Sequence, residues 1–136
     1  MTEVQLPLGI GPHEGRECLL MLASKKPMAM FCEVAAHSDH FPEEEFAPHV
    51  LTGAIRRREE FYVSADGAIV TRCLFFALPG QEWRMDAAHM IQEAIFTGCR
   101  CGTEADDVQL GRLLGYTEAD IATFLDHARP FRAQSL

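Results

Sequence analysis

The clearest pattern of apolar and polar positions lies between residues 54 and 78, where two extended segments flank a short turn. Ile55–Ser64 and Ala68–Leu78 are rich in residues that favour strands, and Ala65-Asp66-Gly67 supplies residues that tolerate positive φ. The second segment is apolar on both sides, which is typical of a central strand covered on both faces, with Arg72 reaching the rim. The first segment is more charged and belongs nearer a sheet edge.

Helical patterns surround this predicted hairpin. Residues 14–24 are good helix formers, followed by two lysines and stopped by Pro27, so they predict a short buried helix. Residues 83–96 predict an amphipathic helix that lies on the sheet and ends at Gly98. Its apolar arc consists of Trp83, Ala87, Met90, Ile91, Ala94 and Ile95, and its polar side of Asp86, His89, Gln92 and Glu93.

The C-terminal third predicts two further helices. Thr-Glu-Ala-Asp occurs at 103–106 and again at 117–120, where each threonine can cap a helix start in a variant capping box with aspartate. Helices over 106–114 and 118–128 follow, separated by Gly115 and Tyr116 in a tight corner, and Pro130 is expected to end the second.

The remaining segments complete the expected architecture. Residues 28–34 form an apolar run of the length of a buried strand, and 43–48 suit one helical turn because Pro48 opposes a longer helix. We expect an irregular arm over 1–13 and a flexible tail over 130–136. The prediction is a single α+β domain: a small antiparallel sheet with a central hairpin at about 54–78, packed against helices, with a helical C-terminal segment.

Charge and cysteine content narrow the functional classes. A net charge of -8 opposes nucleic acid and anionic membranes, and the basic run Arg56–Arg58 is flanked by the acidic runs 43–45 and 59–60, which favours mutual neutralisation. Five scattered cysteines do not resemble a disulfide framework, and the chain start does not resemble a secretory signal. The apolar stretches are too short to span a bilayer, so a cytoplasmic protein with free thiols is expected.

The first candidate site is a loop that contains His37, Asp39, His40 and Glu43, with His49 further along the chain. Imidazole and carboxylate groups are the ligands that zinc and other divalent metals prefer. The spacing matches no established metal motif, so a solvated surface loop is the competing interpretation.

Two candidate sites involve cysteines. Cys99 and Cys101 flank Arg100 just before a predicted helix start, where charge and dipole would favour their thiolates. Their C-x-C spacing lacks the C-x-x-C of redox sites, so a flexible loop is the alternative. Cysteine catalysis is disfavoured elsewhere because Cys18, Cys32 and Cys73 fall in apolar segments, where burial leaves thiols inert.

The last candidate is a ligand pocket formed by Glu82, Trp83 and Arg84 at the start of the helix over 83–96. We favour the alternative that Trp83 anchors this helix to the sheet.

Two functions follow from these patterns. The first is a non-enzymatic module that binds a protein partner or associates with itself, with no cofactor. The second is a small divalent-metal-binding protein or metal-dependent hydrolase that uses His37, Asp39 and His40, with His49 as a further ligand. The patterns leave open whether the chain is an enzyme.

Overall fold

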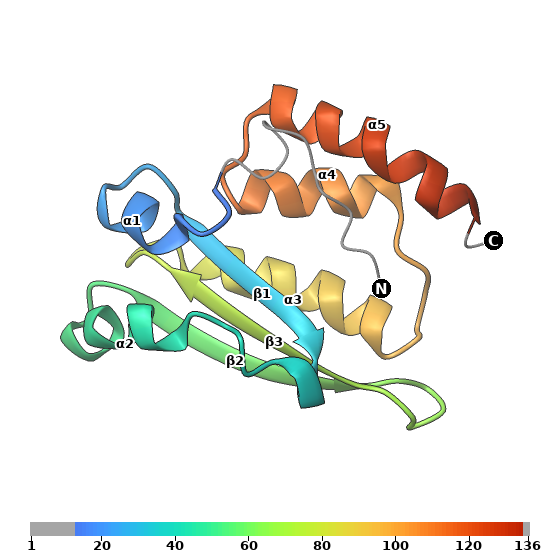
Figure 1. Ribbon diagram of the computed structural model, residues 1–136, viewed down its shortest axis with the longest axis horizontal. Coiled ribbons are helices and arrows are strands. Elements are labelled where there is room, and N and C mark those ends of the chain that lie inside the picture. The colour runs from blue at the N-terminus through green and yellow to red at the C-terminus, as the bar shows by residue number, and fades with distance from the viewer. Residues whose placement is uncertain (1–12, 135–136) are drawn as a thin grey trace.

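The computed structural model describes residues 13–134 (Figure 1). The predicted arm therefore falls almost wholly outside the described residues, as do the last two residues of the predicted tail. The elements, in chain order, are α1 (Glu17–Leu22), β1 (Met28–Val34), the 3-10 helix η1 (Ala35–His37), α2 (Glu43–Thr52), β2 (Arg56–Val63), β3 (Val70–Ala77), α3 (Glu82–Phe96), α4 (Glu104–Leu113) and α5 (Glu118–Gln134).

The strands form a three-stranded antiparallel sheet in the order β1-β3-β2, which confirms the α+β prediction. The predicted hairpin is present, and β3 is its central strand, buried on both faces as its pattern indicated. The charged first arm, β2, lies at an edge as expected. The strand at 28–34 is present, but it occupies the other edge and is fully buried only at Met28 and Ala29.

Two apolar clusters cover the two faces of the sheet. On one face, Cys73 and Phe75 of β3 pack with Met85 and Ile91 of α3 and with Leu113 of α4. On the opposite face, Leu74 and Phe76 of β3 pack with side chains of α1, α2 and the preceding loop; these are Cys18, Met21, Phe41 and Phe46. The sheet is therefore a middle layer, with α1 and α2 in front of it and α3 behind it in the view of Figure 1.

The buried side of α3 differs from the predicted one. Met85, Ala88, Ile91 and Gln92 are buried, whereas Trp83 is 55% exposed and Met90 is 68% exposed. The predicted arc is confirmed at Ala87, Ile91 and Ile95, which pack against the core. It is wrong at Trp83 and Met90, because the docking of the helix on the sheet turns the buried side toward Gln92. Trp83 therefore does not anchor the helix to the sheet.

Two helices continue through proline, contrary to prediction. α2 includes Pro48 and extends to Thr52, and α5 includes Pro130 and extends to Gln134, into the segment predicted as a tail. Proline removes one helical hydrogen bond, and both prolines are exposed, so water can bind the carbonyl oxygen that is left without a partner. In α2, the burial of Phe46 adds apolar stabilisation that a local pattern does not reveal.

The short helix α1 is less buried than expected. Cys18 and Met21 face the core, but Leu19 is 66% exposed. The predicted cap of α4 is confirmed: the Thr103 side chain accepts a hydrogen bond from the Asp106 backbone N–H, and the Asp106 carboxylate accepts one from the Thr103 N–H. In the second copy of the motif, Thr117 accepts a hydrogen bond from the Asp120 N–H at 3.1 Å.

Candidate functional site

A hollow of about 390 Å³ lies beside β1, between α1 and the α4–α5 pair. We call it the β1 groove. Its apolar floor comes from one strand and two helices, and acidic side chains from three separate segments lie around it. The lining residues are Glu14, Glu17, Met30, Asp107, Leu110, Gly111, Leu114, Tyr116, Asp120, Ile121 and Phe124.

The β1 groove borders the outer edge of β1, which no other strand of residues 13–134 pairs with. Cys32 and Cys73 are opposite each other with Cα atoms 4.2 Å apart, the spacing of a non-hydrogen-bonded antiparallel pair. The backbone N–H and C=O groups of Cys32, and by the same alternation those of Met30, therefore point away from β3. Among residues 13–134, no backbone partner occupies this outer side of Met30 and Cys32.

The α4–α5 corner gives the groove its shape. A Cβ atom at Gly111 would approach Ile121 to 2.7 Å, so glycine allows the two helices to pack closely. Gly115 has φ +86° and lies against Pro27, where a Cβ atom would come within 2.6 Å of the proline ring. These close contacts hold the corner against the start of β1.

A buried lysine fixes the same corner. Lys26 is 2% exposed, donates a hydrogen bond from Nζ to the Leu114 carbonyl oxygen at 2.6 Å, and lies over the Tyr116 ring at 4.7 Å. Its Nζ also contacts His13 Nδ1 at 3.0 Å, and the His13 ring stacks on Tyr116. Burial lowers the pKa of Lys26 to about 8 and also lowers the pKa of His13.

The carboxylates around the β1 groove produce a negative potential at Tyr116. Burial is the main reason that the pKa of Tyr116 rises to about 12, and Glu17, Glu14 and Asp120 each raise it further. The groove thus combines an apolar floor with carboxylates that favour a cationic ligand.

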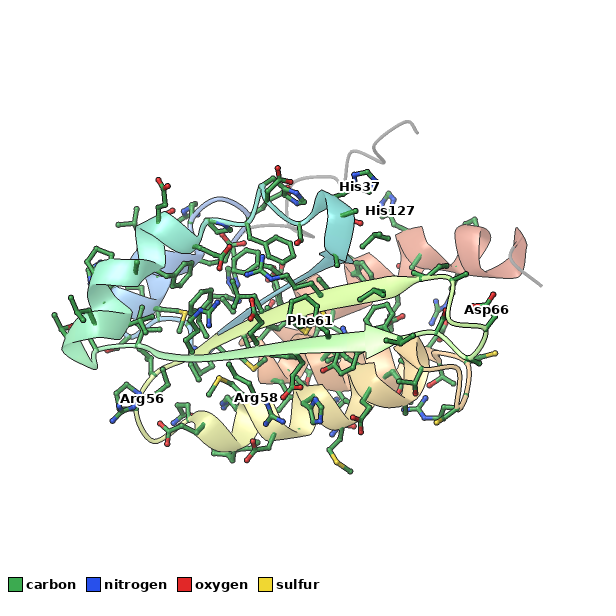
Figure 2. The ribbon with its side chains drawn as sticks, turned by 90° about the horizontal axis from the view of Figure 1, so that it is seen from below. His37, Arg56, Arg58, Phe61, Asp66 and His127 are labelled. Carbon is green, nitrogen blue, oxygen red and sulfur yellow. A yellow bond between two sulfur atoms is a disulfide. The ribbon has the colours of Figure 1, made fainter. Side chains whose placement is uncertain are left out.

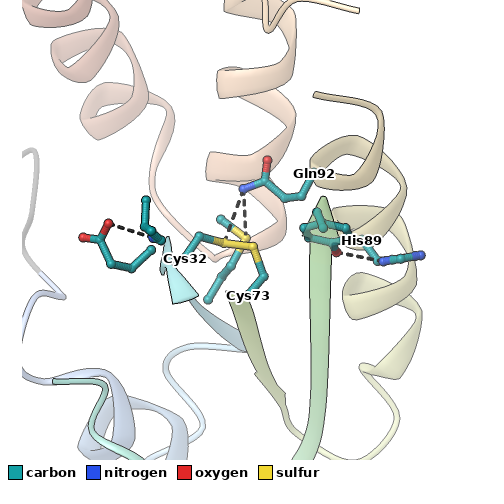
Figure 3. Close-up of a disulfide and its surroundings, with 8 residues drawn as sticks. Cys32, Cys73, His89 and Gln92 are labelled. Atoms are coloured by element: carbon teal, nitrogen blue, oxygen red, sulfur yellow. Dashed lines mark hydrogen bonds between the residues drawn. A yellow bond between two sulfur atoms is a disulfide. The ribbon is translucent and has the colours of Figure 1, made fainter. Parts of the chain in front are cut away.

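Cys32 and Cys73 form a disulfide across β1 and β3 (Figure 3). The Gln92 side chain points toward it from α3, with Nε2 3.7 Å from Cys32 Sγ and 3.5 Å from Met30 Sδ. The expectation of free, inert thiols is wrong for this pair, because the strand register places opposite each other two residues that are 41 positions apart in the chain.

The predicted metal ligands are not gathered into one site. His40 Nδ1 lies 2.7 Å from the His37 carbonyl oxygen, Asp39 is exposed, and His49 belongs to α2. Glu43 accepts a hydrogen bond from Arg72 at 2.6 Å. Within the described part of the chain, no three His, Cys, Asp or Glu side chains are placed so that they could hold a metal ion.

The C-x-C loop places both thiols at the surface. Cys99 and Cys101 are free, as predicted, and both are exposed. The guanidinium between them is directed elsewhere: Arg100 forms a bidentate pair with Asp106, at 2.6 and 2.8 Å. Its charge is therefore neutralised by the capping aspartate instead of being available to the two thiolates.

The predicted pocket at the start of α3 is a connection between helices. The Arg84 guanidinium lies over the exposed Trp83 ring at 4.6 Å and donates to the carbonyl oxygens of Arg112 and Leu113, at 3.1 and 2.9 Å. The Glu82 carboxylate accepts a hydrogen bond from the Gly80 N–H. Arg84 thus satisfies carbonyl groups at the end of α4.

The basic run in β2 is neutralised at two of its three arginines, Arg57 and Arg58, whereas Arg56 is exposed and has no ion pair among the described residues. Arg58 pairs with Glu60 at 3.0 Å and with Asp86 at 2.6 Å. Arg57 and Arg72 alternate with Glu43 and Glu59 in a ring of ion pairs on the α2 side of the sheet, at 2.6 to 3.4 Å. Arg72 is 9% exposed, so it is buried in this ring and does not reach the rim.

Sequence reasoning did not identify the β1 groove. Its lining is spread from residue 14 to residue 124. Asp107 follows the first Thr-Glu-Ala-Asp sequence and Asp120 ends the second, but this sequence predicts only the start of a helix and not a groove. Neither a protein-family model, nor a curated protein, nor a solved structure matches this chain. Between residues 13 and 134, no helix has the length and apolar content that crossing a membrane requires.

Proposed function

We propose that this chain is a protein-binding module, and that it accepts an extended, basic segment of a partner protein along the outer edge of β1. The observation that carries the proposal is that outward backbone groups of Met30 and Cys32 lie beside a groove with an apolar floor and acidic surroundings. An added strand would gain main-chain hydrogen bonds from the edge and side-chain contacts from the groove.

The side-chain pattern of the partner follows from the geometry of a strand. Alternate side chains of an added strand point to opposite faces of the sheet, so every second residue would face the β1 groove. Apolar side chains suit the floor formed by Leu110, Ile121 and Phe124, and lysine or arginine suits the neighbouring carboxylates. The net charge of -8 would also accelerate the encounter with a basic partner.

Binding can be tested with a capped, fluorescently labelled peptide in which leucine and lysine alternate, using anisotropy to measure Kd. We expect binding that weakens as salt is added and that is lost when glutamate replaces lysine in the peptide. Glu17→Lys/Asp120→Lys should weaken it at least about tenfold, since two of the four groove carboxylates change sign. Glu44→Lys/Glu45→Lys, at two exposed sites on α2 across the sheet, changes the net charge by the same amount and is the matched control, which should have little effect.

Strand addition makes a sharper prediction for the peptide backbone. Only alternate amides of an added strand donate to β1, so N-methylation of one alternate set should abolish binding while methylation of the other set should be tolerated. Equal loss from both sets would show that the peptide does not pair with β1. Unchanged affinity in Glu17→Lys/Asp120→Lys would show that the groove is not the binding site.

A further inference from the structure

The other edge of the sheet, β2, also has backbone groups directed outward. Ser64 N–H donates to the Ile69 carbonyl oxygen at 2.9 Å, which identifies the even-numbered residues of β2 as those hydrogen-bonded to β3. The groups of Arg57, Glu59 and Phe61 therefore face away from β3. Within the described residues, no strand pairs with this side of β2.

The charge order along β2 is complementary to itself in the antiparallel direction. If two copies pair about a two-fold axis at Arg58, Arg57 lies opposite Glu59 of the second copy, and Arg56 lies opposite Glu60. Each of these pairs occurs twice by symmetry. The single like-charge pair is Arg58 with its own counterpart, and each Arg58 is already paired with Glu60 and Asp86 of its own chain.

Other registers match less well. Moving the axis to Glu59 keeps one complementary pair, Arg58 with Glu60, but places two glutamates opposite each other and sets Arg57 against Phe61. Moving it to Arg57 gives only arginine opposite arginine near the axis. The charges that protect an exposed edge from unspecific pairing therefore favour one register of self-pairing.

The surface on the α2 side of β2 is also complementary in shape to a second copy, because it has both an exposed aromatic side chain and a hollow. Phe61 is 54% exposed and lies on the α2 side of β2, opposite to Arg58 (Figure 2). A hollow of about 300 Å³, which we call the α2 hollow, lies on the same side and is lined by Glu43, Ala47, Val50, Leu51, Arg57 and Phe76. Leu51 is 90% exposed. In the register centred on Arg58, Phe61 of the second copy is a diagonal neighbour of Arg57 and so lies beside this hollow.

We propose that two copies of this chain form a symmetric dimer through antiparallel pairing of β2 about Arg58, with Phe61 of each copy in the α2 hollow of the other. The dimer would join the two sheets into one and leave β1 at both outer edges. The dimer uses the edge opposite to the β1 groove, so an experiment can contradict it without contradicting the function proposed above, and the reverse.

Site-directed crosslinking tests the register. In a Cys99→Ser/Cys101→Ser background, Arg58→Cys places two thiols opposite each other at a non-hydrogen-bonded pair, and mild oxidation should give a covalent dimer on a non-reducing gel. Glu60→Cys is the matched control, because its two thiols would lie about 13 Å apart along the strands. Mixing Arg56→Cys with Glu60→Cys should restore crosslinking. Failure of Arg58→Cys to crosslink, or equal crosslinking by Glu60→Cys alone, overturns the proposal.

The mass in solution provides a test without cysteines. Light scattering of the unaltered protein should give twice 15.2 kDa, and a monomer at the highest soluble concentration would contradict the dimer. Phe61→Glu should raise the dissociation constant at least about tenfold while the circular dichroism spectrum is unchanged. Met90→Glu alters an apolar residue on α3 that is even more exposed than Phe61 and should leave the dimer intact. Equal effects of the two variants would contradict a role for Phe61.

Discussion

The two edges of the sheet offer the same kind of backbone groups but different side chains. β1 is apolar along most of its length, and its carboxylates come from neighbouring helices and loops. β2 carries a block of three arginines followed by a block of two glutamates within the strand itself. An edge whose charges lie outside the strand favours a partner of different composition, whereas an edge with both signs in one strand is complementary to a second copy. Side-chain placement thus separates two kinds of strand addition in one small sheet.

The edges are also held to β3 in different ways. β1 is joined by the Cys32–Cys73 disulfide, and β2 by ion pairs in which Arg72 of β3 contacts Glu59. A covalent bond restricts the unfolded chain and is insensitive to pH or salt near neutrality, whereas an ion-pair ring depends on the ionisation of its carboxylates. The following three experiments test this contrast.

The largest effect is expected at the β1 side. Cys32→Ala/Cys73→Ala should lower the free energy of unfolding by about 4 kcal/mol, because the disulfide closes a loop between residues 41 positions apart. Urea unfolding with and without a thiol reductant measures this effect: the reductant should destabilise the unaltered protein and leave the double variant unchanged. Cys99→Ser, at an exposed free thiol, serves as the control. If the reductant did not change the free energy of unfolding of the unaltered protein, the disulfide would not stabilise the fold.

The next effect concerns the ion-pair ring. Arg72→Ala leaves Glu43 and Glu59 without their buried cation and should cost about 3 kcal/mol at neutral pH. Hydrogen bonding to Arg72 is the main reason that the pKa of Glu43 lies below its ordinary value of 4.5. The stabilisation is therefore complete above that value and disappears as the pH falls through the lowered pKa.

Urea titrations of both proteins across the acid range measure the pH effect. The gap in stability between the unaltered protein and Arg72→Ala should narrow as the pH falls below 4.5. Arg112→Ala, which loses only an exposed pair with Glu118, should change stability by about 0.5 kcal/mol or less at any pH. A gap that stays constant into the acid range would exclude an ionisation-dependent contribution from the ring.

The variant with the smallest expected effect on stability, Met30→Pro, distinguishes peptide binding at β1 from dimer formation at β2. Met30→Pro removes an N–H that points outward from β1, and Met30→Ala is its control because it removes the same groove side chain and keeps the N–H. β1 can still pair with β3 in both variants, so the free energy of unfolding of Met30→Pro should lie about 1 kcal/mol below that of Met30→Ala. Peptide binding at β1 should fall at least about tenfold, while the dimer through β2 persists in light scattering. Phe31→Pro removes an N–H that pairs with β3 and should destabilise the fold much more. If Met30→Pro bound the peptide normally, pairing at β1 would be wrong.

Local chemistry explains which elements could be predicted. The Asp66-Gly67 turn, the apolar faces of β3 and the Thr103 cap of α4 each depend on residues a few positions apart, and all three are present. α2 and α5 are longer than predicted, because each continues past the proline, Pro48 or Pro130, that was expected to limit it. The cost of an exposed helical proline is limited, and packing elsewhere in the helix offsets it.

The sequence alone determined the hairpin, the α+β class and the edge position of the charged strand, because these depend on alternation and on neighbours along the chain. Only the tertiary structure decided which stripe of α3 is buried, that Cys32 meets Cys73, and that carboxylates from residue 14 to residue 120 surround one groove. These features depend on strand register and on helix docking, which bring distant residues together and which no local pattern encodes.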